Sequence, residues 1–471
     1  MKRYERYANE IADLIRNGVL NPGNRLPSVR QASTSRKISP STVFAAYYLL
    51  ESRGLVQVRP RSGYYVRPRP SPAPAEPQTS RPDGSSTTVA VSDLVFEVLG
   101  SVKEREVVPL GSAFPGAGLF PLGKLARSLS SGMRGLDPWR IVEDLPPGNA
   151  RLRRQIALRY AIAGLSIDAD EIVITNGALE ALNLSLQAVT RPGDVVVVES
   201  PTFYAALQAL ERLNLKAVEV ATHPRDGIDL DALASVLRNH PVRACWLMPN
   251  FQNPLGSLMP DDRKRELVAL LAANDVALVE DDVYGELYFG PRPPPPAKAY
   301  DAGGLVMHCG SFSKCLAPGY RVGWVAAGRH AQKIERLKLM TTLSAAIPTQ
   351  LALSHYLDRG GYDRHLRQLR RALSDQQERA LQAVARYFPK GTRVTRPQGG
   401  YFLWVEMPAN VDALRLHRLA LSHDISLAPG HLFSADRRFR SCVRLNYGHP
   451  GDARLDGALK TVGKLASVMA A

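Results

Sequence analysis

The sequence predicts an α/β protein with a mostly parallel sheet covered by helices, preceded by a small, basic, helical domain. Three observations support this class. Short continuous apolar runs alternate with helical stretches beyond residue 91, as in parallel strands buried on both faces. The first 70 residues carry more than half of the net positive charge. A proline-rich segment without apolar periodicity separates the two regions.

Length and composition limit the possible classes of protein. With 471 residues, of which 45% are apolar and 22% charged, the chain has enough material for several folded domains. No apolar run approaches the ~20 residues that a membrane helix needs, and the first residues do not form a secretory signal. The four cysteines are scattered, without the paired spacing of metal ligands. We therefore expect a cytoplasmic protein with reduced thiols, no membrane segment and no bound metal.

The positive charge is concentrated at the amino terminus. Residues 1–70 contain 13 Lys and Arg against 4 Asp and Glu, which gives +9 of the total net charge of +16. The rest of the chain contains 47 against 40, which gives +7. A solvated basic surface would explain such a segment, but nucleic-acid binding is favoured when a suitable fold accompanies the charge.

The periodicity of the basic segment is that of a winged helix-turn-helix. Apolar residues at helical spacing predict a first helix over residues 4–17. A second helix starts near Ser28, and a third, over residues 39–52, opens with a serine cap followed by proline. Two alternating strands, 55–58 and 64–66, enclose a hairpin tip with two arginines.

The domain boundaries follow from these patterns. We expect the winged helix-turn-helix domain over residues 1–68. A linker over residues 69–105 follows, because prolines that alternate with small and polar residues favour extended conformations. The large domain occupies residues 106–471, with a smaller subdomain over about 345–471.

Polar and glycine-rich segments follow consecutive apolar runs of the large domain. Because ligands of parallel sheets bind outside the carboxyl ends of the strands, these segments should lie together. A helix that opens after glycine suits a phosphate, and aromatic, carboxylate and lysine side chains suit an aromatic aldehyde. The expected strands include 195–198, 244–248, 276–279, 305–308 and 322–326. Together the segments expected at the site predict a phosphorylated aromatic aldehyde as its ligand. They are residues 175–178, 201–204, 253–256, 281–284 and 311–314.

The basic segment also contains specific motifs. They are Asn21 to Arg30, Ser41-Thr42-Val43, Ala46-Tyr47, Leu50-Glu51, Gly54-Leu55 and Ser62 to Val66. In these motifs it closely resembles the GntR family of bacterial transcription regulators. The resemblance implies double-stranded DNA as a partner, with the third helix in the major groove and arginines on phosphates or guanines. The DNA-binding residues that it implies are Arg25, Ser28, Arg30, Ser39, Ser41, Thr42, Arg59 and Arg61.

The large domain contains a second set of motifs. They are Gly148 to Arg153, Asn253 to Gly256, Asp281 to Tyr284, Ser311 to Lys314, Arg321 to Trp324, Gly399 to Trp404 and Val443 to Leu445. In these motifs the chain from about residue 108 to its end resembles a class I aminotransferase domain of the fold-type-I pyridoxal-phosphate group. The resemblance implies pyridoxal 5'-phosphate as cofactor.

The resemblance also implies the roles of individual residues. Lys314 forms the internal aldimine, Asp281 pairs with the pyridine nitrogen, and Asn253 and Tyr284 bind the ring phenolate oxygen. A ring stacks on the cofactor, with Phe203 favoured over Tyr204. Arg444 clamps the carboxylate of an amino-acid ligand. The phosphate is held by Gly177, Ala178, Ser311, Ser313 and Arg321.

Two positions depart from the aminotransferase pattern. Leu179 stands where many relatives carry a polar residue beside the phosphate loop. Glu143 occupies the position of a tyrosine that reaches the phosphate of the neighbouring subunit in many aminotransferases. An acid is unfavourable next to a phosphate dianion, so this departure puts efficient turnover in doubt.

Together the two modules resemble the MocR subfamily of GntR regulators and its YdcR-like branch. The resemblance implies a head-to-tail homodimer that senses a small amino compound, a carboxylate, through aldimine exchange at Lys314. The alternative is a catalytically active aminotransferase with a fused DNA-binding head. A third reading is that pyridoxal phosphate itself is the effector. Of these three, the sequence favours the regulator.

Overall fold

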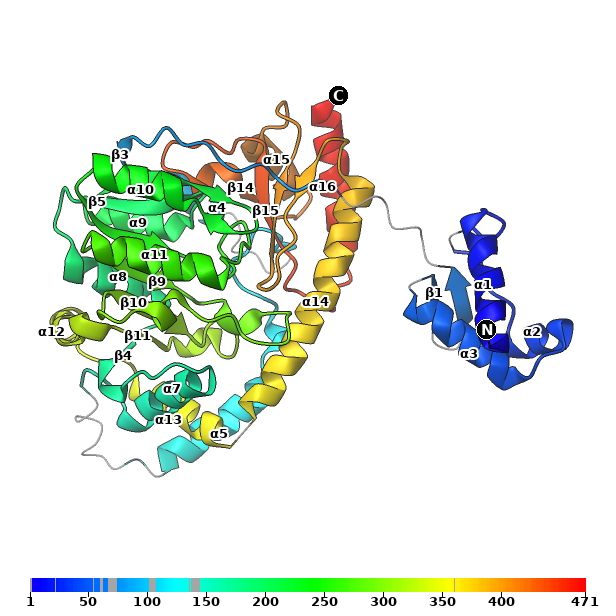
Figure 1. The fold of residues 1–471 in the computed structure, drawn as a ribbon, viewed down its shortest axis with the longest axis horizontal. Helices are drawn as coiled ribbons and strands as arrows, with labels where there is room; N and C mark the ends of the chain where they lie inside the picture. Colours follow the sequence, from blue (N-terminus) through cyan, green and yellow to red (C-terminus); the bar gives the residue numbers. More distant parts are fainter. Residues whose placement is uncertain are drawn as a thin grey trace. The chain divides into compact units, whose positions relative to one another are not determined.

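The computed structural model describes residues 2–21, 23–53, 55–59, 62–66, 74–100, 107–134, 136, 145–359 and 361–471. The chain divides into two compact units, an amino-terminal head over residues 1–73 and a body over residues 74–471. Figure 1 shows the head as a small helical unit and the body as layers of helices around a large sheet. Each unit has its own hydrophobic core.

The head has the expected winged helix-turn-helix fold. Its helices and strands are α1 (Arg3–Arg16), α2 (Val29–Arg36), α3 (Pro40–Ser52), β1 (Val56–Arg59) and β2 (Gly63–Val66). Ser28 caps α2 by accepting a hydrogen bond from the amide of Gln31, and Ser39 caps α3 in the same way from Thr42. The buried face of α3 packs against α1 and includes Tyr47, whose hydroxyl donates to the carbonyl of Pro27 at 2.9 Å.

The body is built on a mixed sheet. Its strands, in spatial order, are β3 (Ser86–Thr88), β6 (Lys216–His223), β5 (Val195–Ser200), β8 (Val242–Leu247), β9 (Ala277–Asp281), β10 (Val306–Ser311), β11 (Gly323–Ala326) and β4 (Ile172–Thr175), with β7 (Gly227–Ile228) paired to β6. Strands β6, β5, β8, β9 and β10 run parallel to one another. Strand β11, expected as a further apolar run, lies antiparallel between β10 and β4. The expected α/β class with a mostly parallel sheet is confirmed.

Helices cover both faces of this sheet, which explains the continuous apolar strands. On one face, alternate strand residues pack against α10 (Leu230–Asn239) and α11 (Asp261–Ala273). On the other, the intervening strand residues pack against α8 (Ala178–Val189), α9 (Tyr204–Arg212) and α12 (Ala331–Thr341). Both side-chain directions of each strand are therefore buried, as the sequence indicates.

Further helices pack at the β4 edge and in the carboxyl-terminal part of the body. At the β4 edge, α5 (Leu122–Arg134) and α7 (Ala150–Ile162) pack against α13 (Ile347–Asp358) (Figure 1). The long α14 (Tyr362–Tyr387) then leads to a second sheet, β12 (Arg393–Val394), β13 (Phe402–Glu406), β15 (Cys442–Asn446) and β14 (Ala428–Pro429), covered by α15 (Ala413–Leu421) and α16 (Leu455–Ala470). None of the helices in these described ranges is both long and apolar enough to cross a membrane.

The segment from residue 74 to residue 100 differs from the linker expected over residues 69–105. Its strand β3 pairs with β6, and its helix α4 (Ser92–Gly100) packs against α9. The carboxylate of Glu211 accepts hydrogen bonds from the amides of Val91 and Ser92, both at 3.0 Å. A proline-rich segment has no core of its own, but it still has backbone groups and valines that an existing domain can bind. This part of the expected linker therefore belongs to the body.

Candidate cofactor and effector site

The carboxyl ends of five strands meet at one edge of the large sheet. Strands β5, β8, β9 and β10 run in the same direction, and β4 shares it because both β10 and β4 are antiparallel to β11. The polar segments expected at the site follow these strand ends. The structure thus brings together the segments that lie far apart in sequence.

Lys314 follows β10, and a backbone carbonyl and an aromatic ring contact its amine. Its Nζ donates to the carbonyl of Ala113 at 2.7 Å and lies 3.9 Å from the ring centre of Phe114. Burial, together with the positive charges of Arg444 and Arg321, lowers the pKa of Lys314 to about 7, against the opposing effect of Asp281. Near neutral pH about half of the amine is therefore uncharged, which is the form that acts as a nucleophile.

Asp281 ends β9 and is 1% exposed. Burial raises its pKa to about 7, and Asp282 acts in the same direction while Lys314 opposes it. Its Oδ1 is buried and accepts no hydrogen bond from the described residues. Such an unsatisfied buried acceptor is costly, and a protonated ring nitrogen would satisfy it.

Arg444 in β15 is fully buried. It donates to the Asn253 Oδ1 at 3.0 Å and to the carbonyl of Gly111 at 2.8 Å, and its guanidinium lies 4.2 Å from the ring centre of Phe402. No carboxylate of the described residues forms an ion pair with it, and its Nε has no hydrogen-bond partner there. A buried cation in this condition needs an anionic partner, and a ligand carboxylate would supply one.

Asn253 links this cation to Tyr284, the phenol expected at the site. Its Nδ2 lies 3.4 Å from the hydroxyl of Tyr284, to which it donates. Tyr284 is 2% exposed and packs edge-on against Tyr401 and Phe402. Burial raises the pKa of Tyr284 well above its ordinary value, so its hydroxyl remains protonated and can donate to a ligand oxygen.

A cradle for a small anion lies at the start of α8. Gly177 caps this helix with φ = +85°, and an added Cβ would lie 2.4 Å from Nη2 of Arg321. Arg321 donates to the Oγ of Ser313 at 3.1 Å. Ser313 in turn accepts a hydrogen bond from Ser311 at 2.9 Å. The amide of Ala178, at the first position of α8, completes a set of donors of the kind that binds phosphate.

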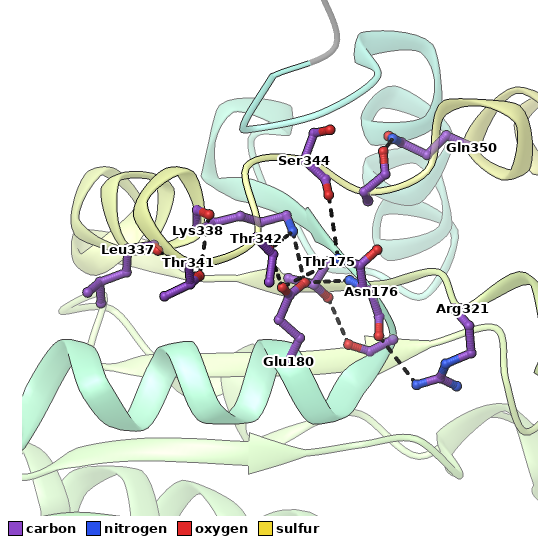
Figure 2. A network of polar contacts seen from close by, with 12 residues as sticks. Thr175, Asn176, Glu180, Arg321, Leu337, Lys338, Thr341, Thr342, Ser344 and Gln350 are labelled. Carbon is purple, nitrogen blue, oxygen red and sulfur yellow. Dashed lines mark hydrogen bonds and ion pairs between the residues drawn. The ribbon is translucent and has the colours of Figure 1, made fainter.

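An ion-pair network is linked to this cradle through Asn176, whose carbonyl accepts a hydrogen bond from Arg321 (Figure 2). Lys338 in α12 is 1% exposed and donates to Glu180 at 2.9 Å. Glu180 also accepts from the amide of Asn176 and the hydroxyl of Thr342, both at 2.5 Å. Although burial acts in the opposite direction, these bonds lower the pKa of Glu180. Sequence reasoning missed this network, because no local pattern pairs residues of α8 and α12.

The loop over residues 111–114 was also missed. Its carbonyl oxygens bind Arg444, Lys314 and Tyr401, and Phe114 packs on the lysine amine. Gly111 permits this approach, because an added Cβ would lie 2.5 Å from the backbone of Leu427. The short glycine- and proline-rich stretch in which the loop occurs gave a signal only for irregular backbone.

The two aromatic candidates lie side by side with different exposure. The rings of Phe203 and Tyr204 are 4.8 Å apart. Tyr204 is 6% exposed and packs on Phe433 in the core, whereas Phe203 is only partly buried. Phe203 is therefore the more accessible of the two rings.

The DNA-binding candidates of the head are placed as follows. Arg25 pairs its backbone with Tyr65 of β2, and its side chain lies beside Gly63. The first turn of α3 presents Ser41 and Thr42, whose hydroxyls lie 2.9 and 2.7 Å from the Oγ of Ser39. The side chains at the outer surface, besides Ser28 and Ser39 at the helix caps, include Arg25, Arg30, Ser41 and the aromatic Phe44.

Some expected positions fall outside what the structure describes. Arg61 and Glu143 lie outside the described residues, and Arg59 is described only as the last residue of β1. Leu179, the other departure from the aminotransferase pattern, lies in the first turn of α8 and is 46% exposed. It leaves the backbone donors of the cradle in place.

Comparison with known families agrees with this arrangement of a head and a body. The chain belongs to the class I and II aminotransferases, whose family model matches residues 145–461. The model of the bacterial regulatory proteins of the gntR family matches residues 3–66. Fold and site therefore define a GntR-type, DNA-binding transcription regulator that carries an aminotransferase domain and depends on pyridoxal phosphate.

Individual relatives narrow this class. The chain is similar to two HTH-type transcriptional regulators of Escherichia coli strain K12, with 50% identity to YdcR over 99% of both chains and 37% identity to YjiR over 98% of both. Among solved structures, it resembles the α-aminoadipate aminotransferase LysN from Thermus thermophilus in complex with N-(5'-phosphopyridoxyl)-L-leucine. That match has a TM-score of 0.71 and 29% identity, and covers 81% of this chain and 99% of LysN. The expected resemblance to YdcR-like MocR regulators and the expected cofactor are both supported.

Proposed function

We propose that the body of this regulator holds pyridoxal phosphate at Lys314 and senses an amino compound that carries a carboxylate. One observation carries the proposal. Asp281 and Arg444 are fully buried, belong to the same site, and form no ion pair among the described residues. A buried carboxyl group and a buried guanidinium without ion-pair partners are expensive for a folded protein unless ligands complete them.

The residues of the site fit the cofactor. When bound, pyridoxal phosphate supplies an aldehyde that reacts reversibly with primary amines, either of Lys314 or of an amino compound. Asp281 would hold its ring nitrogen in the protonated form, and Tyr284 with Asn253 would bind its ring oxygen. The phosphate would lie in the cradle at the start of α8, and Phe203 would cover the ring.

The remaining residues would select the effector. Arg444 is positioned to bind a carboxylate through its fork, and Asn253 holds the guanidinium in place at 3.0 Å. The lowered pKa of Lys314 keeps its amine ready to give up and regain a proton near neutral pH. The effector is therefore an amino acid or a related amino carboxylate rather than a simple amine.

Signal transfer to DNA would use a head-to-tail homodimer. Leu179 in α8 and Leu339 and Met340 in α12 are exposed apolar side chains on two helices that pack together, and they would lie in the dimer interface. A ligand that binds one conformation of the body more tightly shifts the population toward it. The heads would then present their α3 helices to DNA in a different spacing.

The test is ligand-dependent transcription of the regulated gene. Lys314→Ala should abolish the response to the effector, whereas Lys460→Ala, which removes an exposed lysine of α16, should leave it intact. Full response in the Lys314→Ala protein would refute the proposal. An effect of cofactor on operator affinity without any amino acid would instead favour pyridoxal phosphate itself as effector.

A second candidate function is aminotransferase turnover, and one observation favours it. The site contains a lysine, a buried carboxylate and a buried arginine together, which is the set that transamination needs. The assay is incubation with single amino acids and 2-oxoglutarate, with keto-acid product as readout. Many turnovers per site would support the enzyme, and at most one turnover would support the regulator alone.

A further inference from the structure

A groove of about 610 Å³ lies between α5 and α13, at the β4 edge of the body. Figure 1 shows these two helices side by side, at the start of the long α14. The volume is in the range of small-molecule sites. The lining of the groove includes Lys124, Arg127 and Arg134 of α5, Tyr356 of α13, the following Arg359, and Arg364 of α14.

The lining is cationic. Five of these residues are Lys or Arg, and none is an acid. The nearest acids on α13 and α14 already bind other cations, Asp358 with Arg151 and Asp363 with Arg159. None of the five lining cations forms an ion pair within the described ranges. The groove therefore concentrates positive charge that the described residues of the body do not neutralise.

Two buried polar atoms in the same groove lack partners. Tyr356 is 4% exposed, and its hydroxyl forms no hydrogen bond with the described residues. The Nδ1 of His355 is buried and equally without a partner among them. Burial lowers the pKa of His355, and the charges of Arg359 and Arg151 act in the same direction. Hydroxyl groups buried without a partner are rare, and a ligand in the groove would supply a partner here.

We infer that this groove is a second ligand site of the body, one that binds phosphate groups. Arginine forks bind phosphate oxygens in pairs, and five cations match a ligand with several negative charges. The hydroxyl of Tyr356 would donate to one of the same oxygens. The phosphate groups come either from the backbone of DNA near the operator or from a free polyphosphorylated small molecule. This site is separate from the cradle at Gly177 and does not depend on the role of Lys314.

The experiment uses the full chain with its cofactor bound. The variant Arg127→Gln/Arg364→Gln removes two charges, one on each side of the groove. Its matched control is Arg238→Gln/Arg415→Gln, in which two arginines of α10 and α15 outside the groove are changed with the same loss of charge. Tyr356→Phe removes only the hydroxyl. Tripolyphosphate binding is measured by calorimetry, and binding to a duplex of about 30 base pairs without operator is measured across salt concentrations.

A free phosphate ligand predicts saturable tripolyphosphate binding that weakens about tenfold in the groove variant and several-fold in Tyr356→Phe, but not in the control. DNA as the source predicts that the slope of log Kd against log salt falls by about 2 in the groove variant alone, at ~0.9 per phosphate contact. Either result supports the inference. It is overturned if both measurements are unchanged, or if the control loses as much as the groove variant.

Discussion

The lowered pKa of Lys314 makes a quantitative prediction for capture of the cofactor by cofactor-free protein. Only the uncharged amine attacks an aldehyde, so the rate follows the uncharged fraction. With a pKa of about 7, this fraction rises about tenfold between pH 6 and pH 8 and is nearly complete above pH 8. A lysine with an ordinary pKa of about 10.4 would instead gain about tenfold for every pH unit up to pH 10.

The assay is stopped-flow absorbance of pyridoxal phosphate as it binds, at constant ionic strength. Reaction of the cofactor with Nα-acetyl-lysine in the same buffers provides the control. The ratio of the protein rate to this control rate cancels the ionisation of the cofactor, and it should fall about tenfold per pH unit above pH 8, because only the free amine still gains uncharged form there. Arg444→Gln provides a second test. Arg444 lowers the pKa of Lys314, so its removal should move the midpoint to higher pH. A protein rate that still rises about tenfold per unit above pH 8 would refute the assignment of Lys314 as a buried, activated amine.

Four further predictions follow from the same structure. Arg444→Lys keeps the charge but loses the fork, so affinity for an amino carboxylate should fall about tenfold or more in titrations, whereas affinity for the corresponding amine should not. Gly177→Ala should weaken cofactor binding in equilibrium dialysis, because its Cβ clashes with the cradle. Glu180→Gln should destabilise the body by about 3 kcal/mol in urea unfolding, because Lys338 is left buried and unpaired. Ser28→Ala should destabilise the head by about 1 kcal/mol through loss of a helix cap.

Each of these has a contradicting result. Equal losses for the carboxylate and the plain amine would exclude Arg444 as the clamp. Unchanged dialysis constants for the glycine variant would place the phosphate elsewhere. The stabilisation from Glu180 belongs to its ionised form, whose pKa is lowered on folding, so it should fade as the pH falls through that lowered pKa. Wild type and Glu180→Gln should therefore converge at low pH, and a difference that is constant with pH would argue against the ion pair. An unfolding curve of the head that Ser28→Ala leaves unchanged would argue against the cap.

Local sequence signals predicted the head almost completely. Ser28 and Ser39 were expected as helix caps because serine directly before a helical pattern is favoured at the N-cap, and the structure confirms both caps. The ends of the body strands were equally predictable from the sequence, because a parallel strand buried on both faces is a continuous apolar run rather than an alternating pattern. Asp281, for example, is the last residue of β9 as expected.

The features that sequence could not supply are long-range ones. Glu180 and Lys338 pair across 158 positions, and Lys314 binds the carbonyl of Ala113 across 201. Neither contact leaves a local pattern. The segment over residues 74–100 has the composition of a linker. Its strand β3 forms only because the edge of the sheet at β6 is available for pairing.

The central claim is that one ligand event at Lys314 controls DNA binding by the head. The most direct measurement titrates the cofactor-bound protein with an amino carboxylate while recording cofactor absorbance and affinity for an in vitro selected operator duplex on the same samples. Both signals should change with the same midpoint, and Lys314→Ala should remove the change in DNA affinity. A change in DNA affinity that persists in Lys314→Ala, or that has a different midpoint from the absorbance, would contradict it.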